Sequence, residues 1–149
     1  MIGLHGLMRW AVLIAGIVAI ILAIQGLAGK RPVAKPHRLA NLAFLISADV
    51  QLLLGLFSYA GSTLIAQAFS DFGTAMHTPQ LRFFAMEHGL TAVLGIAALH
   101  IAYARAKRGP DDSARHRTIA IGFSIAMLLF ILAIPWPWRA LVGRPLWPW

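Results

Sequence analysis

The sequence predicts an all-α integral membrane protein, a four-helix bundle whose helices run alternately up and down. Of the 149 residues, 59% are hydrophobic and only 12% are charged, whereas a soluble domain typically has about 25% charged residues. The mean hydropathy is +0.73. Four apolar stretches are each close to or longer than the ~20 residues that cross the hydrocarbon of a bilayer. The lipid bilayer is therefore the predicted surrounding of the chain.

The predicted helices cover about residues 3–28, 39–69, 81–106 and 113–138. The first is too long for the apolar region of a signal peptide and has only Arg9 as an early charge, so we expect it to remain as a membrane anchor. Proline and glycine residues interrupt the chain after the first and third helices. The helices are predicted to form one domain, 1–138, followed by a tail, 139–149.

Basic residues lie mainly in two connecting loops, 29–38 and 105–117, which hold nine of the thirteen lysines and arginines. Because two helices separate these loops, they lie at the same end of an up-down bundle. The positive-inside rule makes this end cytoplasmic and places both termini on the outer, periplasmic side. In so apolar a chain the net charge of +8 indicates topology, and no nucleic-acid partner is expected.

The tail is rich in tryptophan and proline. Tryptophan favours the headgroup region, which predicts an aromatic anchor on the outer surface. Proline prevents a regular helix, which leaves open a second interpretation in which the tail docks on other membrane-protein subunits. A seam of small residues at every fourth position of the first helix favours close helix contact: Ala11, Ala15, Ala19 and Ala23.

Polar residues within the apolar stretches are the candidate site residues, because ionisable groups at membrane depth are costly and mark function. Glu87 and His88 are neighbours in the third helix, and Arg9 has a comparable depth in the first. One interpretation is structural, a buried ion pair between Arg9 and Glu87 that joins the two helices. The catalytic residues are unknown, and whether the chain is an enzyme stays open.

The other interpretation is a haem b site. The chain has no cysteine, so histidine is the main candidate metal ligand, and two imidazoles can hold haem iron. The first and third helices of an up-down bundle can stand on a diagonal, which makes His5 and His88 the predicted ligands. Arg9 and Arg82 would meet the haem propionates, and Gly95, two turns from His88, would leave room for a flat macrocycle.

Asp49 and Gln51 lie near the middle of the second helix, where an unpaired ionised carboxylate is expensive. Asp49 forms either an interhelical hydrogen-bond clamp or, with its neighbours, a proton or quinone-headgroup site. A second haem is not predicted. His100 is expected to be a hydrogen-bonded interfacial histidine, and His37 and His116 are expected to be solvated loop residues.

Five blocks in order along nearly the whole chain resemble a family of small four-helix bacterial membrane proteins labelled cytochrome b-like: LHGLMRW, LISADVQLLLGL, LRFFAMEHGL, HRTIAIGFSIAM and IPWPWR. The resemblance implies the bacterial inner membrane as location and haem b as cofactor, with His5 and His88 at the family's histidine positions. Related sequences can carry histidine where this chain has Asp49, so no ligand role is carried over to that position.

Two functions remain as alternatives. In the first, the protein carries electrons on haem b between a quinol or another membrane donor and an acceptor on the outer side, and Glu87 tunes the site. In the second, it has no cofactor and is an accessory subunit of a larger respiratory or photosynthetic complex. Its alanine seam and its tail would then contact the other membrane-protein subunits.

Overall fold

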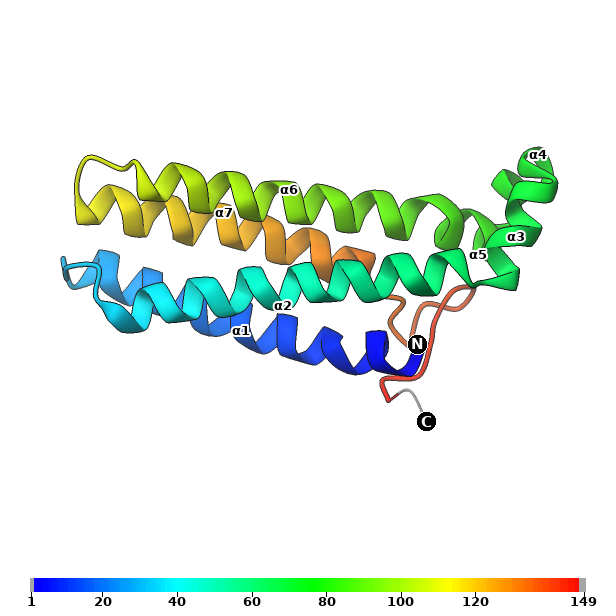
Figure 1. The fold of residues 1–149 in the computed structure, drawn as a ribbon, viewed down its shortest axis with the longest axis horizontal. Coiled ribbons are helices and arrows are strands. Elements are labelled where there is room, and N and C mark those ends of the chain that lie inside the picture. The colour runs from blue at the N-terminus through cyan, green and yellow to red at the C-terminus, as the bar shows by residue number, and fades with distance from the viewer. Residues whose placement is uncertain (1, 148–149) are drawn as a thin grey trace.

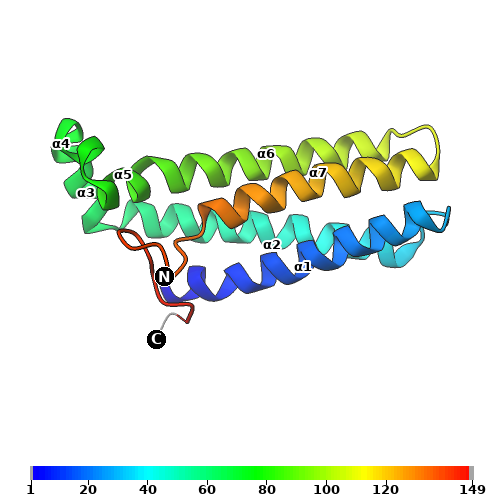
Figure 2. The ribbon, with the colours of Figure 1, turned by 180° about the vertical axis from the view of Figure 1, so that it is seen from behind.

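The computed structural model describes residues 2–147, and this part of the chain is all-α (Figure 1). Four helices lie side by side along the long axis of the molecule (Figure 1 and, from behind, Figure 2). Their length and hydropathy suffice to cross a membrane: Gly3–Ala28, Lys35–Ala60, Pro79–Lys107 and Asp112–Ala133. The prediction of four long apolar helices packed in an all-α bundle is confirmed.

The third long helix is composite, because α5, the π-helical segment η1 and α6 follow one another without a break. α1 packs along α2 and α7, and α6 packs along α7, whereas α2 and α6 touch only sparsely. α1 and α6 therefore stand on a diagonal of the bundle. The elements in chain order are α1 (Ile2–Ala28), α2 (Lys35–Ala60), α3 (Thr63–Ser70), α4 (Phe72–His77), α5 (Pro79–Arg82), η1 (Phe83–Glu87), α6 (His88–Lys107) and α7 (Asp112–Ala133).

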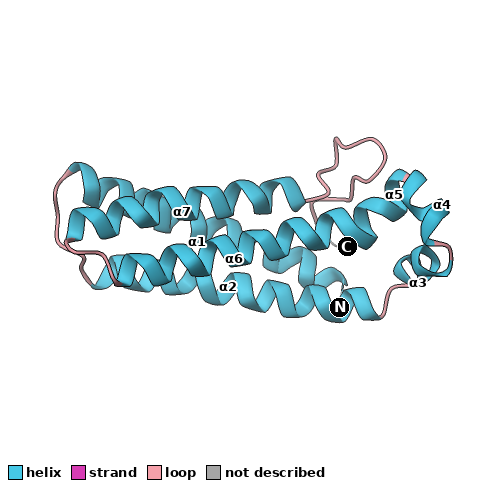
Figure 3. Ribbon diagram, turned by 90° about the horizontal axis from the view of Figure 1, so that it is seen from above, coloured by secondary structure: helices cyan, strands magenta, loops and turns pink. Residues whose placement is uncertain are grey.

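The second long helix is shorter than the predicted range 39–69. α2 ends at Ala60, and the chain turns at Gly61 before it restarts as α3. The Ser62 hydroxyl caps α3 by accepting a hydrogen bond from a backbone N–H of its first turn. α3 and α4 then protrude from one end of the bundle (Figure 3).

The fourth long helix begins and ends at recognisable signals. Asp111 caps its N-terminus, because its carboxylate accepts a hydrogen bond from the Ala114 N–H at 2.7 Å. The helix ends at Ala133, short of the predicted residue 138. Pro135 follows closely and lacks the N–H that a continued helix requires.

The tail folds back over the end of the bundle where α1 begins. Arg9 donates a hydrogen bond to the carbonyl oxygen of Leu146, and the rings of Trp10 and Trp147 lie 5.7 Å apart. We call this end, with the tail and α3–α5, the tail end. The opposite end, where the two basic loops connect α1 to α2 and α6 to α7, is the basic end (Figure 1).

The core of the bundle lies between these two ends. Phe44, Leu99 and Phe123 are its largest fully buried side chains, and the rings of Phe44 and Phe123 meet edge to face at 5.3 Å. Ala19 and Ala23 of the alanine seam are buried in this core. This part of the seam therefore serves packing within the chain.

Candidate functional site

His5 and His88 meet at the tail end, brought together by the diagonal helices α1 and α6. Their ring centroids are 6.0 Å apart and their planes lie at 80° to each other. With metal–nitrogen bonds of about 2 Å, two imidazoles on opposite sides of one metal have ring centroids about 6 Å apart. The separation of the two rings is therefore that of a bis-histidine pair.

Both histidines line a cavity of about 330 Å³, which we call the two-histidine cavity. Small-molecule sites typically measure ~300–1,000 Å³ and are mostly apolar. Exposed side chains from two helices line its outer part, namely Leu56 of α2 and Leu90 and Val93 of α6. The cavity thus opens between α2 and α6, on a face of apolar side chains that a membrane would cover.

The main chain orients His88. Its Nδ1 lies 2.8 Å from the carbonyl oxygen of Ala133 on α7. Because a carbonyl oxygen only accepts, Nδ1 carries the proton and donates it, and Nε2 keeps its lone pair. Metal-binding histidines almost always have their second nitrogen fixed by such a partner.

The π-helical segment η1 leads directly into His88. Such segments are rare and frequently occur at functional sites, because the extra residue per turn changes the direction of the side chains that follow. Phe83 and Phe84 of this segment lie 5.9 and 6.4 Å from the His88 ring, centroid to centroid. Sequence reasoning missed this segment, since its mainly apolar residues carry no signal that distinguishes a π-turn from an α-turn.

His5 is held against α2. Its Nε2 lies 3.3 Å from the side-chain amide of Gln51, while its Nδ1 and the Gln51 Oε1 are buried without hydrogen-bond partners in the described part of the chain. Gly55 allows this approach, because a Cβ at that position would lie 3.1 Å from the His5 ring. Unpaired buried polar atoms are costly, and a bound ligand would remove that cost.

The predicted ion pair between Arg9 and Glu87 is wrong. Glu87 pairs with Arg82 instead, with 2.6 Å between Oε1 and Nε. The two residues are five apart, which is the spacing of the i→i+5 hydrogen bonds of a π-helix, so η1 explains a pairing that α-helical spacing does not predict. Arg9 is buried, binds the Leu146 carbonyl and has an unpaired Nε among the described residues.

The two arginines predicted to meet propionates lie in different places. Arg9 lines the two-histidine cavity, whereas Arg82 is outside the set of lining residues. The Arg82 side chain is occupied by Glu87 and by the carbonyl oxygen of Met76, at 3.2 Å from its Nη1. Of the two, only Arg9 is positioned to contact a polar group of a ligand in the cavity.

Gly95 does not leave room for a ligand, so that prediction is wrong. A Cβ on Gly95 would lie 2.6 Å from the ring of Phe130, which already fills the space. Gly89 lines the cavity instead, and a Cβ there would meet no atom within 4 Å. Sequence reasoning missed Gly89 and Gly55 because glycine is also common at helix contacts that bind nothing.

Asp49 and His100 join α2 to α6 on the basic-end side of the two-histidine cavity. The Asp49 Oδ1 lies 2.9 Å from the His100 Nε2, and both side chains are about half exposed, at 46% and 45%. This is the geometry of the interhelical clamp. Gln51 takes no part in it, because its amide contacts His5.

The remaining histidine pair meets at the basic end, where the rings of His37 and His116 lie 4.7 Å apart. The expectation that His116 is solvated is wrong, because Gly26 of α1 leaves space for its ring and only 2% of the residue is exposed. The His116 Nε2 lies 3.1 Å from the Arg31 carbonyl, and the His37 Nδ1 accepts from the Ala34 N–H. At 4.7 Å these rings are too near to lie on opposite sides of one metal with metal–nitrogen bonds of about 2 Å.

No family model, curated protein or solved structure matches the chain. Within residues 2–147, no cluster of three or more His, Asp or Glu side chains could hold a metal ion. The fold and the site define a small multi-pass helical membrane protein with a two-histidine cavity between its helices.

Proposed function

We propose that the protein binds haem b in the two-histidine cavity, where His5 and His88 would hold its iron, and acts as a membrane electron carrier. The observation that carries this proposal is the 6.0 Å separation of the two rings, which belong to diagonal helices and line the same cavity. Haem b, when bound, supplies a one-electron redox centre, and the protein supplies position and surroundings.

The residues around the cavity fit such a group. The Ala133 carbonyl fixes the protonated Nδ1 of His88. The Gln51 amide can present either its oxygen or its NH₂ group to His5. With the oxygen turned to the protonated Nε2 of His5, the unpaired Nδ1 has its lone pair free. The unpaired Nε of Arg9 would meet a carboxylate of the cofactor.

The apolar lining has two consequences for electron transfer. It keeps water away from the two imidazoles, and a low local dielectric affects the potential of a redox centre. The opening between α2 and α6 also faces the region where hydrocarbon would lie, so a quinol dissolved in the bilayer would reach the cavity sideways. Leu56, Leu90 and Val93 are the side chains that such a donor would pass.

The proposed orientation follows from charge. Loops 29–38 and 105–117 hold nine of the thirteen basic residues, so we place the basic end in the cytoplasm of a bacterial cell and the tail end in the periplasm. The two-histidine cavity then lies near the outer surface of the inner membrane. The electron acceptor would bind on that side.

An accessory subunit without its own cofactor is the second candidate. One observation favours it: the chain after α7 exposes Trp138 and, in the tail, Leu141, which are 72% and 68% accessible. An accessory subunit would use the alanine seam and the tail to contact other subunits. Parts of both already make contacts within the chain, since Ala19 is buried in the core and Trp147 packs on Trp10. The haem proposal accounts for the two-histidine cavity, which the accessory function leaves without a purpose.

The absorption spectrum of the purified protein, oxidised and reduced, tests the proposal. We expect a Soret band and a reduced b-type α band that disappear in His5→Ala and in His88→Ala. His100→Ala is the matched control, because this histidine lies on the same helix as His88 but pairs with Asp49. A wild-type protein that stays colourless when expressed with ample haem would overturn the proposal. Pigment that survives both cavity variants would overturn the ligand assignment.

A further inference from the structure

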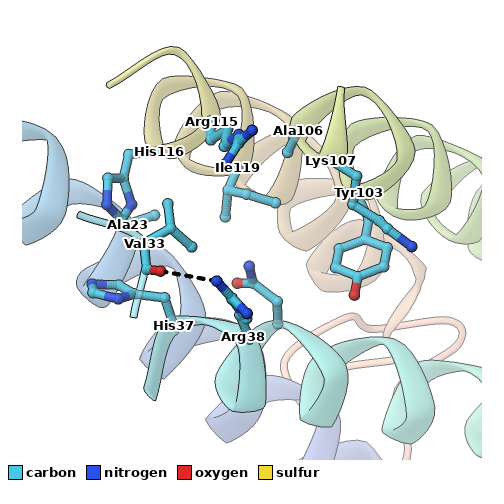
Figure 4. A pocket seen from close by; sticks show the side chains of 11 residues that line it. Ala23, Val33, His37, Arg38, Tyr103, Ala106, Lys107, Arg115, His116 and Ile119 are labelled. Atoms are coloured by element: carbon cyan, nitrogen blue, oxygen red, sulfur yellow. Dashed lines mark hydrogen bonds between the residues drawn. The ribbon is translucent and has the colours of Figure 1, made fainter. Parts of the chain in front are cut away.

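A second pocket, of about 290 Å³, lies at the basic end. Three basic side chains from three helices line it, namely Arg38 of α2, Lys107 of α6 and Arg115 of α7 (Figure 4). No Asp or Glu of the described residues is part of its lining. We call it the basic pocket, and its composition indicates an anionic ligand.

The charges of the basic pocket are poorly compensated. Arg38 donates only a 3.4 Å hydrogen bond to the Val33 carbonyl, drawn as a dashed line in Figure 4, and the Lys107 Nζ lies 5.6 Å from the centre of the Tyr103 ring. Neither residue forms an ion pair within residues 2–147.

Arg115 is the third cation and has one anionic neighbour. Its Nη1 lies 3.4 Å from the Asp112 Oδ1, with 41% of the Arg115 side chain and 39% of the Asp112 side chain exposed. So long and exposed a pair contributes little. Three cationic side chains therefore line the pocket, and only one of them has a carboxylate partner, which it pairs with weakly.

The depth of the pocket indicates where the anion comes from. α2 has 26 residues and at 1.5 Å per residue is about 39 Å long, whereas the hydrocarbon of a bilayer is about 30 Å thick. The pocket is lined by the first two turns of α2 and the last turns of α6. About one turn at each end therefore extends past the hydrocarbon when the bundle spans a membrane. This places Arg38, in the first turn of α2, and Lys107, at the end of α6, at the level of the lipid headgroups.

We propose that the basic pocket binds the phosphate of an anionic lipid. Arg guanidinium groups bind phosphate oxygens in pairs and Lys binds them as a point charge, and basic pockets between membrane helices suit anionic headgroups. The lipid chains lie along the sparsely packed face between α2 and α6, where Leu42, Ile46 and Ile101 are exposed. This site is independent of haem binding.

Native mass spectrometry of the full chain in detergent tests this proposal, with phosphatidylglycerol and phosphatidylcholine of identical acyl chains as probes. We expect the wild type to retain phosphatidylglycerol selectively. The double variant R38Q/K107Q should bind it about 25-fold more weakly, at about fivefold for each basic residue removed. The matched control R105Q/R108Q removes the same charge at the same end from exposed residues outside the lining and should bind like the wild type.

Three results would overturn the proposal: equal retention of the two lipids, equal weakening in both double variants, or binding of inorganic phosphate that fully displaces the lipid. The last result would assign the pocket to a soluble phosphate. Circular dichroism checks that the variants keep their helix content. Should R38Q/K107Q fail that check, the single variants K107Q and R105Q give the same comparison, with a fivefold difference expected.

Discussion

The two ends of the bundle each bring a pair of histidines together, but they surround the pairs differently. At the tail end the rings of His5 and His88 are 6.0 Å apart in a mostly apolar cavity, and a buried nitrogen of His5 has no partner among the described residues. At the basic end the rings of His37 and His116 are 4.7 Å apart, both bind backbone atoms, and basic side chains surround the pocket beside them.

This difference shows that the neighbours of a histidine pair decide what the pair can do. At the tail end, the wider spacing of the two rings, the apolar lining and the unpaired Nδ1 of His5 favour neutral imidazoles that bind a ligand. At the basic end, close spacing and a backbone hydrogen bond to each ring leave the pair a structural role, and the cations beside it determine the ligand. Each ring packs on a glycine of a neighbouring helix, His5 on Gly55 and His116 on Gly26.

The largest expected effect comes from filling the space beside His116. In Gly26→Ala the new Cβ would lie 2.4–2.7 Å from three ring atoms of a buried side chain, and overpacking of this kind typically costs about 1–3 kcal/mol. We expect a clear loss of thermal stability in detergent without loss of pigment, measured by the temperature at which helix content is lost. Gly61→Ala is the control, because its Cβ would make only an ordinary contact, at 3.6 Å, and Gly61 lines neither pocket. Equal stability of the two variants would contradict a structural role for the His37–His116 pair.

The next effect concerns the tail, which covers one end of the bundle and has no counterpart at the other. A Cβ on Gly143 would lie 2.8 Å from the carbonyl oxygens of Trp136, Pro137 and Arg139, so Gly143→Ala has to open this turn at a cost of about 1 kcal/mol or more. We expect faster proteolysis within the tail and an altered tryptophan fluorescence, since the Trp10–Trp147 contact is lost. Gly61→Ala is the control, because its nearest contact, at 3.6 Å, is ordinary. A tail as resistant as that of the wild type would show that it is held by other contacts.

The four long helices were predictable because their length and hydropathy are properties of composition alone. The end of α2 at Gly61 was not, since the apolar residues continue into α3 and hide the turn. The cap of α7 at Asp111 was predictable, because a carboxylate before a helix is a local signal. The end of α7 was predicted at residue 138 although Pro135 is a local signal, so the helix ends were harder to predict than the helices themselves.

The candidate site shows the same division. His5 and His88 were named from their residue type and depth, and the diagonal arrangement brings them together. The partner of Glu87 was predicted wrongly because η1 brings the side chain of Arg82 next to that of Glu87. No pattern in the sequence reveals a π-turn. Gly95 was assigned to the cavity without knowledge of Phe130, whose ring fills that space. Side-chain packing across helices is a property of three-dimensional contacts, which spacing along one helix does not determine.

A smaller effect is expected from the clamp that separates the two pockets. The hydrogen bond between Asp49 and His100 connects two neighbouring helices that touch only sparsely, and such bonds in membrane proteins contribute about 0.6 kcal/mol on average. A double-mutant cycle with Asp49→Ala and His100→Ala should give a coupling free energy of about that size in unfolding experiments. A coupling near zero would mean that the two pockets are separated by packing alone.

The smallest effect tests whether the protrusion at the tail end is independent of the two-histidine cavity. The Asp71 carboxylate caps α4 by accepting hydrogen bonds from the hydroxyl and the backbone N–H of Thr74, and these bonds hold its pKa below the ordinary value. Because the folded-state pKa is lowered, the contribution of this cap is complete above the ordinary carboxyl pKa of about 3.9 and is lost as the pH falls through the lowered value. Asp71→Ala should mimic that loss at neutral pH and speed amide hydrogen exchange in α4 alone. Since α4 supplies no residue to the cavity lining, pigment content should stay unchanged, and a loss of pigment in this variant would show that the protrusion supports the cavity.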